Sequence, residues 1–273
     1  MSESLTVSEF QERLVGEKAV GVVIDIDETL SATNVAWFDR LEKLFGIPPE
    51  GLTIQALILK YSYAQNVPHW AHQQAALEWM QSQRDSKDAQ KGLPLIPGAV
   101  EGVKQLANIV PVLGYLTVRP VSVVEPTLEW LRGHSFPKVP VVSKPNDVPF
   151  SKGNEWKGQV LKELFAAGAV TGIVDDNPKV SMAAGVDYPG SLFLFGWDSC
   201  PPGVEHAIPC QTWQDVVEEA SKRKDQLNHK NTRSTSDATK NTTSCGQEER
   251  ALEDNNKAEA LTMAQDFVAT KEG

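Results

Sequence analysis

Two aspartates, one residue apart, directly follow an apolar run near the start of the chain. Residues 22–24 are Val-Val-Ile, and Asp25 and Asp27 come next. Side chains alternate along a strand, so both carboxylates share a face, and at a strand end both can turn into one crevice. Two such charges about 4 Å apart repel by roughly 4 kcal/mol at an effective dielectric of about 20. A proton or a cation must offset that repulsion, so the pair indicates chemistry.

Matching polar groups follow two later apolar segments. Residues 109–119 place Thr117 near their end, and residues 170–176 end in Asp175 and Asp176. Lys157 lies between them, near the start of a helical pattern. Open α/β sheets bind their ligands at the carboxyl ends of their strands. We therefore expect these side chains to converge on one crevice.

The remaining pattern is an alternation of strands and helices. The sequence Thr6-Val-Ser-Glu9 predicts a capping box and a short amphipathic helix. Other predicted helices are 35–45, 54–61, 75–80, 99–107, 121–132, 154–167 and 178–184, and predicted strands are 20–25, 109–117, 139–143, 170–175 and 191–195. This order predicts an α/β protein with a Rossmann-like parallel sheet covered by helices on both faces, plus a small all-helical domain.

Composition suggests where the parts begin and end. The core is expected at residues 1–32 and 92–215, with the helical insertion at 33–91. Residues 221–250 are rich in Lys, Asn, Thr, Ser, Asp and Gln, and such a composition buries too little apolar surface to offset chain entropy. We expect a disordered polar tail over 221–273, in which 251–270 is either a marginal helix or solvated chain.

The order of these motifs resembles that of the haloacid dehalogenase-like hydrolase superfamily. The motifs stand here as Asp25-x-Asp27-x-Thr29, then Thr117, then a lysine, then Asp175-Asp176, and the resemblance covers about residues 18–200. It implies the phosphatase branch with a helical cap inserted after the first motif. The implied activity is Mg²⁺-dependent hydrolysis of a small phosphorylated metabolite through an aspartyl-phosphate.

The resemblance also implies a role for each residue. Asp25 would be the nucleophile and a metal ligand. Asp27 would be the general acid and base, with its backbone carbonyl on the metal. Asp175 and Asp176 would complete the metal site, while Thr117 and the lysine bind the phosphoryl group. Charge balance supports the metal separately, because four carboxylates in one crevice need a hard cation such as Mg²⁺. The alternative, that each acidic pair only caps a turn or a helix, explains each pair but not their joint occurrence.

The sequence leaves two questions about positive charges open: which lysine belongs to the third motif, and what Arg119 does. Lys157 is favoured as the lysine of the third motif, because a helix start that binds phosphate would also place it near the anion. Lys144, in Ser-Lys-Pro after a strand, and Lys152 are alternatives. Arg119 either orients the substrate or pairs with an acidic neighbour.

The helical insertion carries a polar and aromatic group whose role is equally open. It is either a wall that faces the substrate or the packing of a small domain, and its members are Tyr61, Tyr63, His69, Trp70 and His72. The two histidines have no further recognisable zinc ligand nearby, so a zinc site is not expected.

Several functions compete with a phosphatase. A phosphomutase or phosphotransferase would use the same Asp25, and a non-catalytic binding or scaffold protein would keep the site without turnover. Dehalogenases of the superfamily lack the second aspartate, so Asp27 favours phosphoryl transfer. A response-regulator receiver is excluded because its acidic pair comes early in the chain, whereas Asp175-Asp176 comes last.

Composition also limits the partners. The formal net charge is −10 without a dense basic cluster, so a nucleic acid is not an expected partner. The first residues lack the pattern of a signal peptide, and no apolar run approaches the roughly 20 residues of a membrane span. The three cysteines match no common zinc spacing, which favours reduced thiols and a cytoplasmic protein. The oligomeric state stays open.

Overall fold

The structure is a computed structural model, and it describes residues 3–228. Within this range seven strands form one sheet in the order β1-β4-β3-β2-β5-β6-β7, and every adjacent pair is parallel. The strands are β1 Ser4–Leu5, β2 Gly21–Ile24, β3 Val112–Pro120, β4 Val141–Lys144, β5 Val170–Asp175, β6 Ser191–Phe195 and β7 Ile208–Cys210. The predicted α/β class with a parallel sheet is confirmed.

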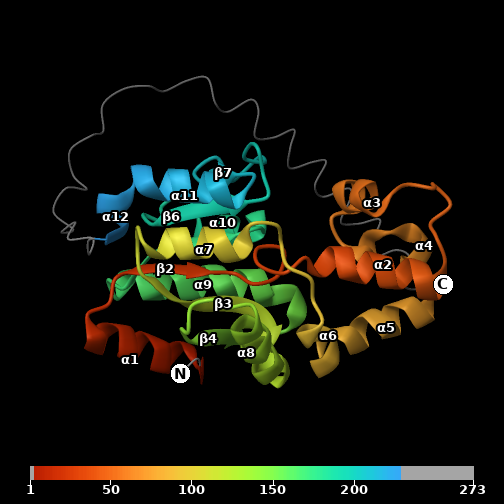
Figure 1. Cartoon of the computed structure of the whole chain (residues 1–273), viewed down its shortest axis with the longest axis horizontal. Helices are drawn as coiled ribbons and strands as arrows, with labels where there is room; N and C mark the ends of the chain where they lie inside the picture. Colours follow the sequence, from red (N-terminus) through yellow and green to blue (C-terminus); the bar gives the residue numbers. More distant parts are fainter. Residues whose placement is uncertain (1–2, 229–273) are drawn as a thin grey trace, which may run out of the picture. The chain divides into compact units, whose positions relative to one another are not determined.

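The alternation of side chains along β2 explains why helices cover both faces of the sheet. Val22 and Ile24 belong to one apolar cluster with α7, α8, α11 and α12, whereas Val23 belongs to a second cluster with α1, α9 and α10 (Figure 1). These helices are α1 Val7–Glu17, α7 Ala99–Ala107, α8 Val124–Gly133, α9 Gly153–Ala166, α10 Pro178–Ala184, α11 Trp213–Lys222 and α12 Lys224–Asn228. A central strand buried on both faces must be apolar throughout, as the run before Asp25 is.

The strand order places a topological switch point at the carboxyl end of β2. From β2 the chain moves to β3 and β4 on one side, and it later returns to β5 on the other side. Connections that leave a strand in opposite directions open a gap at its carboxyl end, where ligands bind in this class of fold. Asp25 follows β2 directly, so its position is set by this topology.

Only helices lie between β2 and β3 in the chain. They are α2 Thr33–Phe45, α3 Ile54–Tyr61, α4 Pro68–Ala71, α5 Gln74–Arg84 and α6 Lys87–Lys91, followed by α7, with a 3-10 turn at Ala64–Asn66. Residues from α2 to α5 share an apolar cluster of their own, centred on Phe38, Leu41, Trp70 and Met80. Figure 1 shows α2 to α6 grouped beside the sheet rather than over its faces.

The structure extends the expected fold at both ends. The capping box at Thr6 and Glu9 is present, and β1 precedes it at the sheet edge. The expectation that the polar tail begins at residue 221 is wrong for residues 221–228. There α11 ends and α12 forms, because Leu227 is fully buried and its carbonyl accepts a bond from Thr171 Oγ1. The rest of the expected tail lies outside the described residues.

Two short 3-10 turns, Val121–Val123 and Phe150–Lys152, lead into α8 and α9. In the described part of the chain, none of the helices has the length and apolar character needed to cross a membrane.

Candidate active site

Three carboxylates meet where β2 and β5 end. The backbone N–H of Asp25 donates to the Val174 carbonyl at 2.9 Å, which holds Asp25 against β5. Asp175 is the last residue of β5, and Asp176 follows it. One carboxylate oxygen from each of the three aspartates lies within 4.8 Å of the others. The structure therefore brings together three of the four acidic residues that the sequence singled out.

Lys157 is the cation of this crevice. Its side chain is 1% exposed, and its Nζ donates to Asp25 Oδ1 at 2.6 Å and to Asp175 Oδ2 at 2.8 Å. The neighbouring Gly158 lets α9 approach α10, since a Cβ there would lie 2.5 Å from the Cβ of Ala183. Close packing of these two helices thus sets where Lys157 lies.

The charges of the crevice do not balance. Burial raises the pKa of Asp25, Lys157 lowers it, and the nearby Asp175 and Asp27 raise it, with a net rise to about 7. Burial, and then the charge of Asp175, also raises the pKa of Asp176 well above its ordinary value. Burial opposes the charge of Lys157, but Asp175 and Asp25 outweigh it and raise its pKa. One ammonium faces three carboxylates, so the site favours a further cation.

The side chain of Asp27 does not join this cluster but faces an arginine. Asp27 Oδ2 accepts from Arg119 Nε at 2.9 Å, and Asp27 Oδ1 accepts from Arg119 Nη2 at 2.7 Å and from Thr33 Oγ1 at 2.6 Å. Burial works against ionisation of Asp27, but Arg119 outweighs it and lowers the pKa of this carboxyl. Of the two readings left open for Arg119, the structure shows the pairing with an acidic neighbour.

Thr117 lies on β3 beside the end of β2. The register pairs Ile24 with Tyr115, so Thr117 extends two residues beyond that pair. Its side chain is fully buried, and its Oγ1 accepts from the backbone N–H of Arg119 at 3.2 Å. Thr117 thus lies where it was expected, on the side of the sheet where the strands have their carboxyl ends.

Sequence reasoning missed the part played by Glu28. This residue has a φ of 56°, in the left-handed region that favours glycine. Its Oε1 accepts from the backbone N–H of Asn34 at 2.5 Å and so caps the first turn of α2, which has no other side-chain cap. Burial raises the pKa of Glu28 to about 7. Its place next to Asp27 was the one signal in the sequence.

Sequence reasoning also missed the contact between Tyr63 and Asn177. The Tyr63 hydroxyl accepts from Asn177 Nδ2 at 2.7 Å, while the backbone N–H of Asn177 donates to Asp175 Oδ1 at 2.9 Å. Burial and then the charges of Asp176 and Asp175 raise the pKa of Tyr63. A residue of the helical insertion therefore reaches the rim of the acidic crevice.

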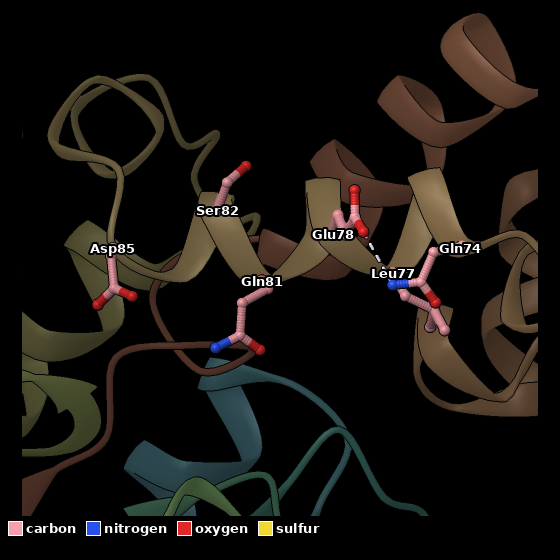
Figure 2. Close-up of a pocket in the computed structure, with 6 residues that line it drawn as sticks. All are labelled: Gln74, Leu77, Glu78, Gln81, Ser82 and Asp85. Carbon is pink, nitrogen blue, oxygen red and sulfur yellow. Dashed lines mark hydrogen bonds between the residues drawn. The ribbon is translucent and has the colours of Figure 1, made fainter.

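A surface groove lies elsewhere, along the exposed side of α5 (Figure 2). Figure 2 shows that most of its side chains are polar, and Gln74 Nε2 donates to Glu78 Oε1 at 2.9 Å. Its lining residues are Gln74, Leu77, Glu78, Gln81, Ser82 and Asp85. None of the site residues named above lines it, and we assign it no ligand.

Comparison with known proteins finds similarity only among solved structures. No family model and no curated protein matches the sequence. A dehalogenase structure is 15% identical with a TM-score of 0.46, covering 74% of this chain and 97% of its own. A Had-superfamily hydrolase from Ehrlichia chaffeensis is 11% identical with a TM-score of 0.45, covering 75% and 98%.

A third similar structure is an HAD family hydrolase from Deinococcus radiodurans R1, solved with bound phosphate and sodium. It is 13% identical with a TM-score of 0.41, covering 77% of this chain and 98% of its own. The order of the motifs and the meeting of Asp25, Lys157 and Asp175 in one crevice agree with the resemblance to haloacid dehalogenase-like hydrolases.

Proposed function

We propose that this protein is a Mg²⁺-dependent phosphatase of the haloacid dehalogenase-like type, acting on a small phosphorylated metabolite. The observation that carries the proposal is the buried contact of Lys157 with both Asp25 and Asp175, beside Asp176. A carboxylate nucleophile needs a nearby positive charge to meet an anionic phosphate, and this arrangement supplies one.

The donor set of the crevice fits Mg²⁺. Its grouped donor atoms are all carboxylate oxygens, which hard divalent cations prefer. Within the described part of the chain, the one ammonium that pairs with them is that of Lys157. Asp25, Asp175 and Asp176 would hold the ion, with the backbone carbonyl of Asp27. When bound, Mg²⁺ supplies positive charge that lowers the repulsion between the nucleophile and the substrate.

The residues of the chain would carry the reaction in two steps. An Asp25 oxygen attacks phosphorus, and the bond to the leaving oxygen breaks. Because Arg119 lowers the pKa of Asp27, Asp27 must first take up a proton from solvent when substrate binds, and it then gives this proton to the leaving oxygen. Asp27 then takes a proton from water, the water oxygen attacks phosphorus, and the aspartyl-phosphate bond breaks to release phosphate. Positioned proton transfer of this kind contributes about 10²–10⁴-fold to the rate. Thr117 and Lys157 would bind the phosphoryl oxygens.

The helical segment 33–91 is the proposed cap. It has its own apolar cluster, and Tyr63 within it bonds to Asn177 at the rim of the crevice. A cap that covers the crevice would exclude water while the aspartyl-phosphate forms.

Two other functions are distinguished by their products. A phosphotransferase would use the same Asp25 but pass the phosphoryl group to an added hydroxyl compound, whereas a phosphatase releases inorganic phosphate at the same rate with or without it. Carbon–halogen cleavage is disfavoured, because Asp27 is present and is held at the crevice by Arg119 and Thr33.

The test is the variant Asp25→Asn, assayed with a generic aryl phosphate and Mg²⁺. The amide keeps the shape of the side chain but is a poor nucleophile, so we expect turnover to vanish while the fold is retained. Asp39→Asn removes a surface carboxylate paired with Lys43 and serves as the matched control, with normal turnover expected. Turnover that persists in Asp25→Asn, after removal of host phosphatases, would falsify the mechanism.

A further inference from the structure

Arg119 is buried and forms an ion pair with Asp27. Its side chain is 4% exposed, and its Nε and Nη2 bond separately to the two oxygens of the Asp27 carboxylate, at 2.9 and 2.7 Å. This fork-to-fork geometry fixes the plane of the carboxylate as well as its distance. A lysine in this place could offer only a single point of charge.

Two further donors of Arg119 are occupied by protein groups. Nη2 donates to Ser31 Oγ and Nη1 donates to Thr127 Oγ1, both at 3.1 Å. The Thr127 hydroxyl in turn donates to the Val123 carbonyl at 2.8 Å, which ties the network to α8. A guanidinium has five N–H donors, so one of them has no acceptor among residues 3–228.

From this geometry we infer that Arg119 is a positioning residue, which acts through Asp27 and does not bind the phosphoryl group. The inference rests on the proposed function, in which Asp27 must face first the leaving oxygen and then a water. The side chain of an aspartate rotates freely unless it is held, and a displacement of about 1 Å in a reacting group can cost about 10²-fold in rate. Thr33 holds Asp27 Oδ1 from the side of α2, and Arg119 holds both oxygens from β3.

Arg119 could position Asp27, bind phosphate or support the fold, and a simple loss of activity would not separate these three roles. A positioning residue lowers kcat only while Asp27 is present. A residue that binds phosphate raises KM and weakens inhibition by inorganic phosphate, whether or not Asp27 is present. A residue that only supports the fold lowers the melting temperature and affects both backgrounds equally.

The experiment is a double-mutant cycle between Arg119 and Asp27. Arg119→Lys and Arg119→Met are made alone and together with Asp27→Asn, and the substrate is an aryl phosphate whose good leaving group keeps the Asp27→Asn background measurable. We expect Arg119→Lys to lower kcat by about 10- to 100-fold with KM within about threefold. In the Asp27→Asn background the further loss should be below about threefold, since the two residues act as a unit. Arg13→Met, on the surface, is the unaffected control.

Two results would overturn the inference: an equal loss in both backgrounds, or a raised KM together with weaker inhibition by phosphate. Absence of Mg²⁺-dependent turnover in the unmodified protein would instead overturn the proposed function. In that case a crystal structure of Arg119→Met decides the inference by itself. A rotated or disordered Asp27 side chain supports it, and an unmoved Asp27 contradicts it.

Discussion

At the scale of single residues, the bonding partners of the three candidate lysines separate them. Lys157 Nζ contacts two carboxylates and is almost fully buried. Lys144 Nζ is also buried, but it donates to the carbonyls of Pro145 and Val148, at 2.9 and 2.5 Å. Lys152 pairs with Glu155 on the surface. Only Lys157 can compensate the charge of Asp25.

Replacing Lys157 by methionine therefore tests the charge balance directly. Removing one partner of a buried ion pair leaves an uncompensated charge and costs about 3–5 kcal/mol. We expect Lys157→Met to lower the free energy of unfolding by that amount in urea denaturation without metal, and to reduce turnover of an aryl phosphate by more than ~100-fold. Lys152→Met is the control and should leave both quantities unchanged, because its ion pair is exposed. Normal turnover in Lys157→Met would contradict the assignment.

The sequence could propose Lys157 but could not exclude Lys144, because the difference between them lies in tertiary packing. Both lysines lie near the carboxyl end of a strand or the start of a helix, so their local patterns are equivalent. The choice depends on how closely α9 packs against α10 at Gly158 and Ala183, which no local spacing reveals. The partner of Arg119 was open for the same reason, since Asp27 lies 92 residues away in the chain.

At the scale of elements, most of the polar and aromatic residues grouped in the helical insertion pack within it, and one of them contacts the core. Trp70 packs edge-on against Phe38 with ring centroids 5.3 Å apart, and a ring nitrogen of His69 lies 3.1 Å from the Phe45 carbonyl. These residues hold the helices together. Of the five polar and aromatic residues that the sequence grouped, Tyr63 is the one that bonds to Asn177 of the core.

Tyr63→Phe removes this bond between the insertion and the core while keeping the ring. A neutral hydrogen bond contributes about 0.5–1.5 kcal/mol, so we expect KM for a phosphorylated substrate to rise about 2- to 10-fold, with a smaller change in kcat. The control is Tyr61→Phe, whose hydroxyl bonds to Glu50 within the insertion. Steady-state kinetics of both variants is the measurement. Equal effects of the two substitutions would show that Tyr63 has no special relation to the site.

Long periodic elements were predictable from sequence, and short ones were not. The helix at Ala99–Ala107 and the strand at Val170–Asp175 match their predicted ranges because each repeats its apolar residues several times. The edge strands β1 and β7 span two and three residues, too few to show alternation. The helix α12 was hidden because Leu227 is its one buried residue in a polar stretch.

At the scale of the whole molecule, a metal ion bound at the acidic cluster would couple stability to pH. Burial is the main cause that raises the pKa values of Asp25 and Glu28 to about 7, whereas unfolded carboxyls titrate near 4. Between about pH 4 and 7 the folded chain thus binds more protons than the unfolded chain. The contribution of these groups to the free energy of unfolding falls as pH rises through this window, and the full penalty is present above it.

Mg²⁺ should remove the part of that penalty that comes from Asp25, so its stabilising effect should grow with pH. A ligand at about 100 times its Kd stabilises a fold by about 2.7 kcal/mol, and protons compete with the metal for the same oxygens at low pH. We expect the increase in melting temperature on adding Mg²⁺ to be clearly larger at pH 8 than at pH 5. The control is Asp175→Asn, in which the increase should shrink at both pH values because a ligand is lost, whereas Asp39→Asn should behave as the unmodified protein does. An increase independent of pH, or one that Asp175→Asn leaves intact, would mean that the ion binds elsewhere.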